Sequence, residues 1–356
     1  MESLLNLFLA FLWSFVIAVF AIPSIISVAH RKNLLDEPNF RGMHQSLTPR
    51  LGGLAIFAGF ISSMTLFGMS TPSIQKILAG SVLLFFIGLK DDIVAISPFK
   101  KFFVQILATG IVVFLGDIRI TSFHGFLNIG EIPDGISYAF SFLTIIGITN
   151  AVNLIDGLDG LAGSITMVIS SVFGLAFFVM DDLPFTFLAV CIIGAIVGFL
   201  RYNIHKAIIF MGDTGSLTCG FLVSVMAIEF LHQDKLQASP SISVAILCIP
   251  LYDTLRVFGW RILKGRSPFS PDKNHIHHIL SRSGLSQLQI VGTLILINMA
   301  LIGITFVLRG LGDNILLPIL IGLFALVTVG LEFLAKKHPE HPKMVMPDAL
   351  LEQEPV

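Results

Sequence analysis

Apolar residues dominate the chain in long runs, and short polar stretches separate these runs. A helix needs roughly 20 mostly apolar residues to cross a bilayer core about 30 Å thick. The runs predict an all-α, polytopic integral membrane protein of about eleven transmembrane helices, with 1–335 as a single transmembrane domain and 336–356 as a C-terminal tail. The predicted spans are 4–28, 51–69, 76–89, 101–117, 136–150, 161–179, 184–200, 214–231, 242–260, 289–308 and 314–334.

Lysine and arginine favour one side of this predicted bundle. With the N-terminus outside, 18 of the 22 Lys and Arg residues fall on the inner side. Positively charged loops stay in the cytosol, so the asymmetry predicts an outer N-terminus and a cytosolic C-terminus. The first span lacks a basic leader and a cleavage pattern, and we expect a retained helix instead of a signal peptide. The outer loop 117–135 alternates apolar residues with Gly and Pro, which predicts a short hairpin.

Composition narrows the class of protein further. Hydrophobic residues make up 54% of the 356 residues and charged residues 13%, whereas ordinary soluble domains carry roughly 25% charged residues. This excludes a soluble globular enzyme and a disordered chain. With a net charge of -1, the chain has no overall positive potential that would attract a polyanion, which argues against nucleic-acid binding. The three cysteines lie in apolar runs and predict neither disulfides nor a metal site.

Polar residues gather in clusters on the predicted inner side, and the outer loops hold nothing comparable. Random loop chemistry would not segregate in this way, so the pattern predicts one composite cytosolic site. The clusters are Asp36–His44 with Thr48–Gly53, Lys90–Asp92, Asn150–Gly160, Met211–Ser216 and Ser267–His278.

The polar Asn150–Gly160 segment carries candidate oxygen ligands along its whole length. Asn150, Asn153, Asp156 and Asp159 recur at every third position, which keeps neighbours on one side of a helix end. Carboxylate and amide oxygens suit Mg²⁺ and not zinc. A helix cap would explain one or two of the four residues. Asp213, at the start of a later span, is a natural second ligand for the same cation, although an N-cap role is an alternative.

The adjacent acids Asp91 and Asp92 follow an apolar helix and repel each other unless a cation lies nearby. They indicate metal or proton handling at the membrane surface, and the alternative is a solvated helix end beside Lys90.

Three histidines, His275, His277 and His278, follow Arg266 and Lys273. No second ligand cluster supports zinc, which normally draws ligands from two places. Imidazoles beside basic residues fit an anionic, pyrophosphate-bearing substrate. A basic loop that touches anionic lipid heads would explain the Arg and Lys but not the histidines.

These segments resemble the polyprenyl-phosphate N-acetylhexosamine-1-phosphate transferase family, which includes MraY, and most closely its WecA/TagO branch of undecaprenyl-phosphate N-acetylglucosamine-1-phosphate transferases. The segments appear in the family's order over most of the chain. In the family's acidic motif a third Asp often follows the second by three positions, and here that position is Ala95. The segments that carry the resemblance are Thr48–Gly53, Lys90–Asp92, Asn150–Ala162, Met211–Ser216 and Ser267–His278.

The resemblance implies an enzyme of the bacterial inner (cytoplasmic) membrane with its site on the cytosolic face. It would transfer N-acetylhexosamine-1-phosphate, with GlcNAc-1-phosphate as the first choice, from a UDP-sugar to undecaprenyl phosphate and release UMP. This would be the first membrane step of a cell-surface glycan pathway, such as lipopolysaccharide O-antigen or a cell-wall teichoic acid. The implied cofactor is Mg²⁺, with Mn²⁺ as a substitute, and a homodimer is one option for the assembly.

The resemblance also implies residue roles. Asn153 and Asp213 would bind Mg²⁺, and Asp91 and Asp92 would orient or deprotonate the lipid phosphate. Asp156 and Asp159 would lie near the nucleotide. The expected substrate-binding residues are Arg50, Lys100, Asn150, Arg266, His275, His277 and His278.

Three alternatives stay open. The same chemistry could use UDP-N-acetylfucosamine or UDP-N-acetylquinovosamine. A secondary transporter would be expected to show repeated halves, and the sequence contains no internal repeat. A non-catalytic membrane scaffold would reduce the polar clusters to solvated loops.

Overall fold

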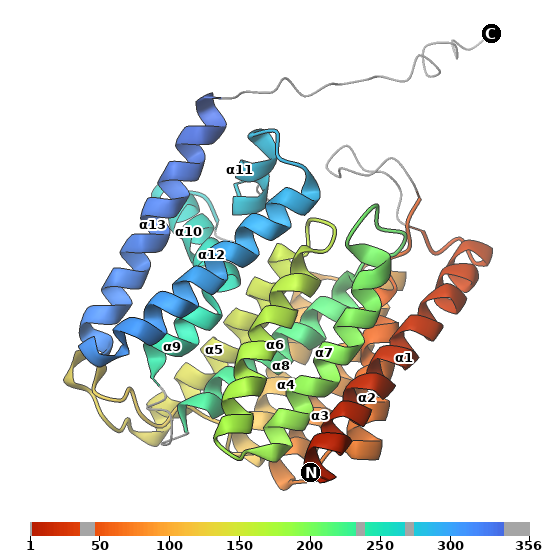
Figure 1. Cartoon of the computed structure of the whole chain (residues 1–356), viewed down its shortest axis with the longest axis horizontal. Coiled ribbons are helices and arrows are strands. Elements are labelled where there is room, and N and C mark those ends of the chain that lie inside the picture. The colour runs from red at the N-terminus through yellow and green to blue at the C-terminus, as the bar shows by residue number, and fades with distance from the viewer. Residues whose placement is uncertain (1, 36–46, 233–238, 268–273, 338–356) are drawn as a thin grey trace.

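The structure is a computed structural model that describes residues 2–35, 47–232, 239–267 and 274–337. These residues form a bundle of helices and no strand, which confirms the all-α prediction for the described part of the chain (Figure 1). The helices are α1 (Glu2–Arg31), α2 (Gly52–Phe67), α3 (Pro72–Ile93), α4 (Pro98–Gly110), α5 (Asp134–Ile155), α6 (Leu161–Val179), α7 (Leu183–Asn203), α8 (Gly212–Leu231), α9 (Pro240–Ile246), α10 (Cys248–Leu263), α11 (Ile276–Arg282), α12 (Gln287–Leu308) and α13 (Asp313–Lys337).

The protein is a multi-pass membrane protein. In the described part of the chain, nine helices are long and apolar enough to cross a membrane, when α4 is taken together with the π-helical segment Ile111–Leu115 that continues it. Helices α9 and α10 make a tenth if the bent pair counts as one span. Helix α2 is apolar but has 16 residues, fewer than the roughly 20 that a straight crossing needs. Each predicted span coincides with a helix or with the bent pair. The count of eleven crossings and their orientation stay predictions.

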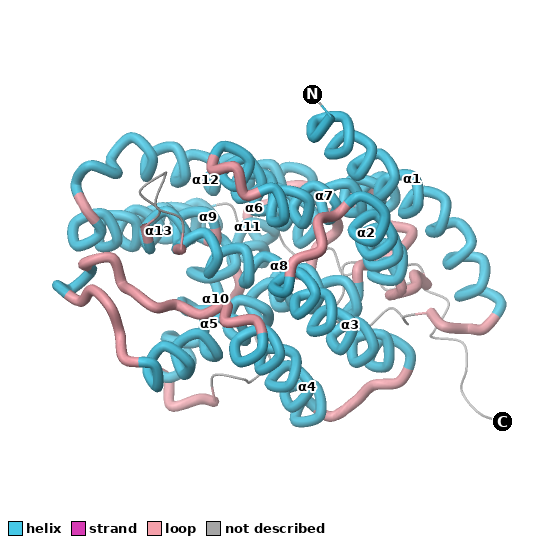
Figure 2. The backbone as a smooth tube through the Cα atoms, turned by 90° about the horizontal axis from the view of Figure 1, so that it is seen from below, coloured by secondary structure: helices cyan, strands magenta, loops and turns pink. Residues whose placement is uncertain are grey.

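Helix α8 forms the centre of the bundle (Figure 2). It packs against α2, α3, α5 and α6, and nearly all of its side chains are buried. Small residues allow this close approach: an added Cβ on Gly53 would lie 2.1 Å from the Gly215 nitrogen, and one on Gly220 would lie 2.7 Å from the Thr149 carbonyl.

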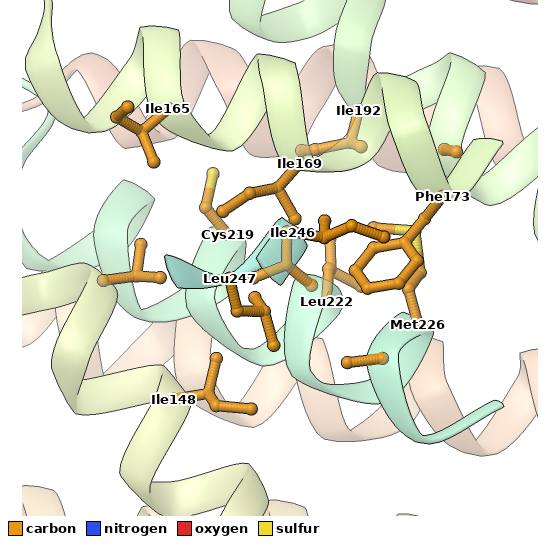
Figure 3. Close-up of a cluster of buried hydrophobic side chains, with 14 of the residues drawn as sticks. Ile148, Ile165, Ile169, Phe173, Ile192, Cys219, Leu222, Met226, Ile246 and Leu247 are labelled. Atoms are coloured by element: carbon orange, nitrogen blue, oxygen red, sulfur yellow. The ribbon is translucent and has the colours of Figure 1, made fainter. Parts of the chain in front are cut away.

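The apolar core fills the space around α8. Figure 3 shows Ile169 and Phe173 of α6 facing Leu222 and Met226 of α8. These side chains are fully or almost fully buried. Burial of apolar area between helices positions the start of α8, which carries Asp213, relative to the neighbouring helix ends.

The span predicted over 242–260 is not straight. Helices α9 and α10 meet at an angle of 87°. Pro250 lies in the first turn of α10 and has no N–H for the carbonyl of Ile246. Asn298 of α12 instead donates to that carbonyl at 3.3 Å and accepts from the Ile249 N–H at 3.4 Å. The break therefore keeps its backbone groups satisfied inside the bundle.

The loop between α4 and α5 forms the predicted hairpin. Ser122 and Glu131 form an antiparallel bridge, and the Phe123 N–H donates to the Gly130 carbonyl at 2.9 Å. Asn314 of α13 accepts from the Leu127 N–H at 2.6 Å. The hairpin thus closes one end of the bundle, opposite the end where α3 and α5 finish (Figure 1).

Candidate active site

The ends of α3 and α5 and the starts of α4 and α8 meet at one end of the bundle. Lys101 of α4 lies between two carboxylates: its Nζ is 2.8 Å from Asp91 Oδ2 and also contacts Asp213 Oδ2. Asn153 of α5 donates to Asp213 Oδ1 at 3.1 Å and to Ser216 Oγ at 2.8 Å. The structure therefore brings together Asp91, Asn153 and Asp213, which the sequence analysis placed in one site.

Asp92 points into the start of α8. Its carboxylate accepts from the Asp213 N–H at 2.7 Å, from the Thr214 N–H at 2.9 Å and from the Thr214 hydroxyl. A carboxylate in this place satisfies free N–H groups of the helix and interacts favourably with its dipole. Gly212 has a φ of +70°, and a Cβ there would lie 2.7 Å from both Asp92 oxygens. Asp92 thus anchors the turn that presents Asp213.

The structure places Lys101, and not Lys100, against the carboxylates. Lys100 is exposed, whereas the Lys101 side chain is 21% exposed and paired. Lys100 was the expected substrate-binding residue. The sequence pattern could not separate the two, because neighbouring helix positions differ by about 100° around the axis.

Asp156 and Asp159 follow α5 but have different surroundings. Burial raises the pKa of the Asp156 carboxyl to about 7, the carboxylates of Asp213 and Asp92 act in the same direction, and the Arg50 guanidinium opposes them. Asp159 is buried and accepts from the Ala207 N–H at 3.2 Å. Asp156 therefore interacts electrostatically with the carboxylates of Asp92 and Asp213. Asp159 instead holds the loop after α7 by a hydrogen bond.

Asn150 ties α5 to α4. Its Nδ2 donates to Gln105 Oε1 at 2.7 Å and to the Ile146 carbonyl at 2.8 Å, and Gln105 donates back at 3.3 Å. Gln105 is 3% exposed. No pattern in the sequence singles it out, because it lies within an apolar run.

The histidines lie beside the loop that follows α5. His277 is buried, and neither of its ring nitrogens has a hydrogen-bond partner among the residues that the structure describes. A Cβ on Gly157 would lie 3.0 Å from its Nε2. Burial lowers the pKa of His277 to about 3, and the neighbouring His278 and His275 act in the same direction. His277 is therefore a neutral ring with unused hydrogen-bonding atoms next to Gly157.

His275 and His278 complete this cluster. The rings of His277 and His278 are 4.2 Å apart, and those of His275 and His277 are 5.9 Å apart. His275 Nδ1 lies 2.8 Å from Asp253 Oδ2 of α10. Arg266 is exposed, and Lys273, like Asp36–His44, lies outside the described residues.

One large cavity connects these groups to the middle of the bundle. It has a volume of about 1910 Å³, and Lys101, Asn153 and His277 line one end of it. Along α5 its lining runs from Phe140 to Leu154, which is about 21 Å of helix. Most of the lining is apolar, and Phe126 of the hairpin and Leu317 of α13 lie at the far end. The cavity can therefore take a long apolar chain whose polar head reaches the charged cluster.

Asp213 and Asn153 carry oxygen donors of the kind that could hold a divalent cation together with a phosphate. Among the described residues, no three His, Cys, Asp or Glu side chains are grouped closely enough to hold an ion by themselves. Asp213 supplies a carboxylate, and the side chain of Asn153, whose amide N–H₂ donates to that carboxylate, also carries an amide oxygen. Mg²⁺ is typically held by one or two carboxylates together with substrate phosphates and water.

Comparison with known proteins identifies a protein family whose model matches part of this chain. The model of the family described as "Glycosyl transferase family 4" matches residues 74–231. This range contains the carboxylates and Lys101 but ends before the histidines.

Whole-chain relatives extend the similarity past residue 231. The "Probable undecaprenyl-phosphate N-acetylglucosaminyl 1-phosphate transferase" of Bacillus subtilis (strain 168) is 33% identical over 287 residues, which cover 80% of each chain. The "Undecaprenyl-phosphate alpha-N-acetylglucosaminyl 1-phosphate transferase" of Yersinia pestis is 30% identical and covers 78% of each chain. The protein of that name from Escherichia coli (strain K12) is 32% identical and covers 74% of this chain and 73% of its own. At this identity and coverage, the chain belongs to glycosyl transferase family 4 and is a glycosyl-1-phosphate transferase.

Proposed function

We propose that the protein transfers GlcNAc-1-phosphate from UDP-GlcNAc to undecaprenyl phosphate and releases UMP, as the first membrane step of a cell-surface glycan. The observation that carries this proposal is the 1910 Å³ apolar cavity that ends at Lys101, Asn153 and His277. A lipid phosphate needs such a tail site beside its charged head. The names of the relatives supply the acceptor and the sugar.

In the proposed reaction, an oxygen of the lipid phosphate attacks the sugar-linked phosphorus of the donor. A new P–O bond forms, and the bond between that phosphorus and the bridging oxygen of UMP breaks, so the electron pair leaves with UMP. Phosphoryl transfer depends mostly on positioning and on neutralising charge. Lys101 would hold one anionic group near Asp213, and the neutral His277 ring would donate its single N–H to another.

Asp213 and Asn153 would hold Mg²⁺, which would neutralise charge on the diphosphate when bound. Asp91 would keep Lys101 oriented, and Asp92 would keep the start of α8 in place. Asp91 need not act as a base, because a phosphate dianion is already a nucleophile.

We place the site on the cytosolic face of the bacterial inner membrane. This rests on the excess of Lys and Arg at that end of the bundle and on the need for a water-soluble donor to meet a lipid acceptor at the surface.

The test is release of uridine-labelled UMP from purified protein with undecaprenyl phosphate and each of several UDP-N-acetylhexosamines. We expect UDP-GlcNAc to be used best, and the panel includes UDP-N-acetylfucosamine and UDP-N-acetylquinovosamine. Preference for another donor would change the sugar, and failure of every donor would refute the transfer reaction.

The metal assignment has its own test. Asp213→Ala and Asn153→Ala should each abolish UMP release, and chelation of divalent ions should abolish it in the wild-type protein. Near-normal turnover by both variants, still dependent on added Mg²⁺, would contradict the assignment.

A further inference from the structure

Asp253 of α10 is a fully buried carboxylate beside the histidine cluster. Its Oδ2 lies 2.8 Å from His275 Nδ1, and its Oδ1 accepts from the Ile276 N–H at 2.9 Å. Arg256, one helix turn further along α10, lies 2.9 Å from Oδ1 and also donates to the Asn274 carbonyl. Each partner of Asp253 thus belongs either to α10 itself or to the segment that begins α11.

A buried charge is stable when it is paired and hydrogen-bonded. Here the pairing joins the bent α9–α10 span to the histidine segment, 22 positions further along the chain. The Ile276 bond caps α11, a role that an uncharged acceptor could also fill. The bond to the His275 ring is not required for that cap, so a second purpose explains it.

The hydrogen bond fixes the tautomer of His275. An ionised carboxylate can only accept hydrogen bonds, so Nδ1 must carry the proton. In the neutral ring Nε2 then has a free lone pair, and in the charged ring Nε2 is a donor that the carboxylate stabilises. The His275 ring lines the cavity, as do those of His277 and His278. With Nδ1 bound to Asp253, Nε2 is the nitrogen that remains for a ligand.

We propose that Asp253 is a positioning residue: its carboxylate accepts from Nδ1–H of His275 and stabilises the ring protonated at both nitrogens, so that Nε2–H donates to the diphosphate of the sugar nucleotide. The inference rests on the proposed function for the identity of that ligand. It assigns a role to a residue inside a predicted span, and the role acts through His275 and not on the substrate directly.

The variant that tests this is Asp253→Asn. Its amide oxygen can still cap α11, but the amide is uncharged and its N–H₂ would face Nδ1, so the ring protonated at both nitrogens would lose its stabilising partner. We expect kcat/KM for the donor to fall by about 10- to 100-fold, as is usual when a residue that orients a functional histidine is changed. The KM for the lipid phosphate should stay within about twofold of the wild-type value. The melting temperature should stay within a few degrees of that of the wild type.

A double-mutant cycle separates positioning from capping. If Asp253 acts through His275, Asp253→Asn should cost at most about twofold in a His275→Ala background, because coupled residues are not additive. A full additional loss in that background would overturn the proposal, and so would wild-type kinetics of Asp253→Asn. Glu332→Gln is the matched control: Glu332 contacts Arg256 from α13 at 3.5 Å, and its loss should leave kcat/KM within about twofold.

A measurement on the wild-type protein keeps the test decisive if Asp253→Asn does not fold. ¹⁵N NMR of the histidine rings should show His275 protonated at both Nδ1 and Nε2 at neutral pH. A ring that lacks the proton on either nitrogen would overturn the proposal. If the wild-type protein released no UMP from any donor, the proposed function would fail, while the protonation of the ring would still test the link between Asp253 and His275.

Discussion

At the scale of the residue, Lys101 is the cation around which the acidic groups are arranged. It contacts Asp91 and Asp213, which are separated by more than 100 positions in the chain. Removing its charge would leave two carboxylates facing each other, and it would take away a group that can hold a phosphate. The neighbouring Lys100 is exposed, so the chain provides its own control.

We therefore expect Lys101→Met to lower turnover by about 100-fold or more, the usual scale for losing a group that stabilises developing charge. Lys100→Met should stay within about twofold of the wild type. Turnover is measured as UMP release at saturating donor. Equal effects of the two substitutions would contradict the placement of Lys101 at the site.

His277 gives a prediction on acid stability. Its pKa in the folded protein is about 3, below the ordinary value of about 6.5 for an unfolded chain. Between these two pH values the unfolded chain binds a proton that the folded protein does not, so this group makes the free energy of unfolding decrease as the pH falls below 6.5. Above pH 6.5 the ring is neutral in both states and contributes no pH dependence.

The Asp156 carboxyl, whose pKa is raised to about 7, acts in the opposite direction over this range, so the test is a comparison of variants. As the pH falls from 6.5 to 4, the melting temperature of His277→Asn should rise relative to that of the wild type. His205→Asn, at an exposed histidine, should show no such relative rise. The absence of a relative rise in the His277 variant would show that the ring is not held neutral by burial.

At the scale of the element, the bend between α9 and α10 shapes the cavity. Leu247 at the bend and Leu251 and Leu255 of α10 line the apolar space beside α5. A continuous helix would not turn Asp253 toward His275. The bend depends on Pro250, which leaves a carbonyl free, and on Asn298, which satisfies it.

Asn298→Leu should destabilise the protein by about 1–3 kcal/mol, because two backbone groups at the bend would lose their partner in a buried place. The matched control is Thr305→Val on the same helix, whose hydroxyl bonds only within α12, to the Leu301 carbonyl at 2.7 Å. Thermal unfolding in detergent measures both. Equal melting temperatures would mean that Asn298 does not support the bend.

The cavity predicts an effect on the lipid substrate alone. Gly147 of α5 lines the cavity, and an added Cβ would meet open space. Gly147→Leu should raise the KM for undecaprenyl phosphate by about tenfold, because the side chain would occupy the path of the tail, and the donor KM should stay unchanged. Gly303→Leu on α12 is the control, since Gly303 also faces open space but does not line the cavity. An unaffected lipid KM in Gly147→Leu would argue against this tail site.

At the scale of the whole molecule, the polar ends of the helices lie at one end of the bundle and the hairpin lies at the opposite end (Figure 1). The orientation of this bundle in the membrane can be tested because the native cysteines Cys191, Cys219 and Cys248 are free and buried. Introduced cysteines would react with little background.

We expect Lys32→Cys, at an exposed position after α1, to react with a membrane-impermeant maleimide only after the cells are opened. Gly130→Cys, at the exposed hairpin, should react in intact cells. The reverse pattern would invert the orientation and place the charged site on the outer face.

The sequence by itself determined where the helices lie, and it predicted that polar segments far apart in the chain meet at one end of the bundle. Hydrophobic runs are local, and burial in a bilayer leaves few other conformations to an apolar run of that length. The same local logic predicted the hairpin and the pairing of Asn153 with Asp213, because helix ends on one face of a bundle must lie near one another.

The tertiary structure alone decided which lysine meets the carboxylates, that Asp92 caps α8, and that Asp253 holds His275 across the bend. These contacts depend on the rotation of each helix about its axis and on the angle of α10. Packing between distant segments sets both the rotation of each helix and the angle of α10. Glycines allow the close approach of helices, and Asn298 hydrogen-bonds at the bend. Neighbouring residues do not encode such rotations, because one step along a helix turns a side chain by about 100° toward different partners.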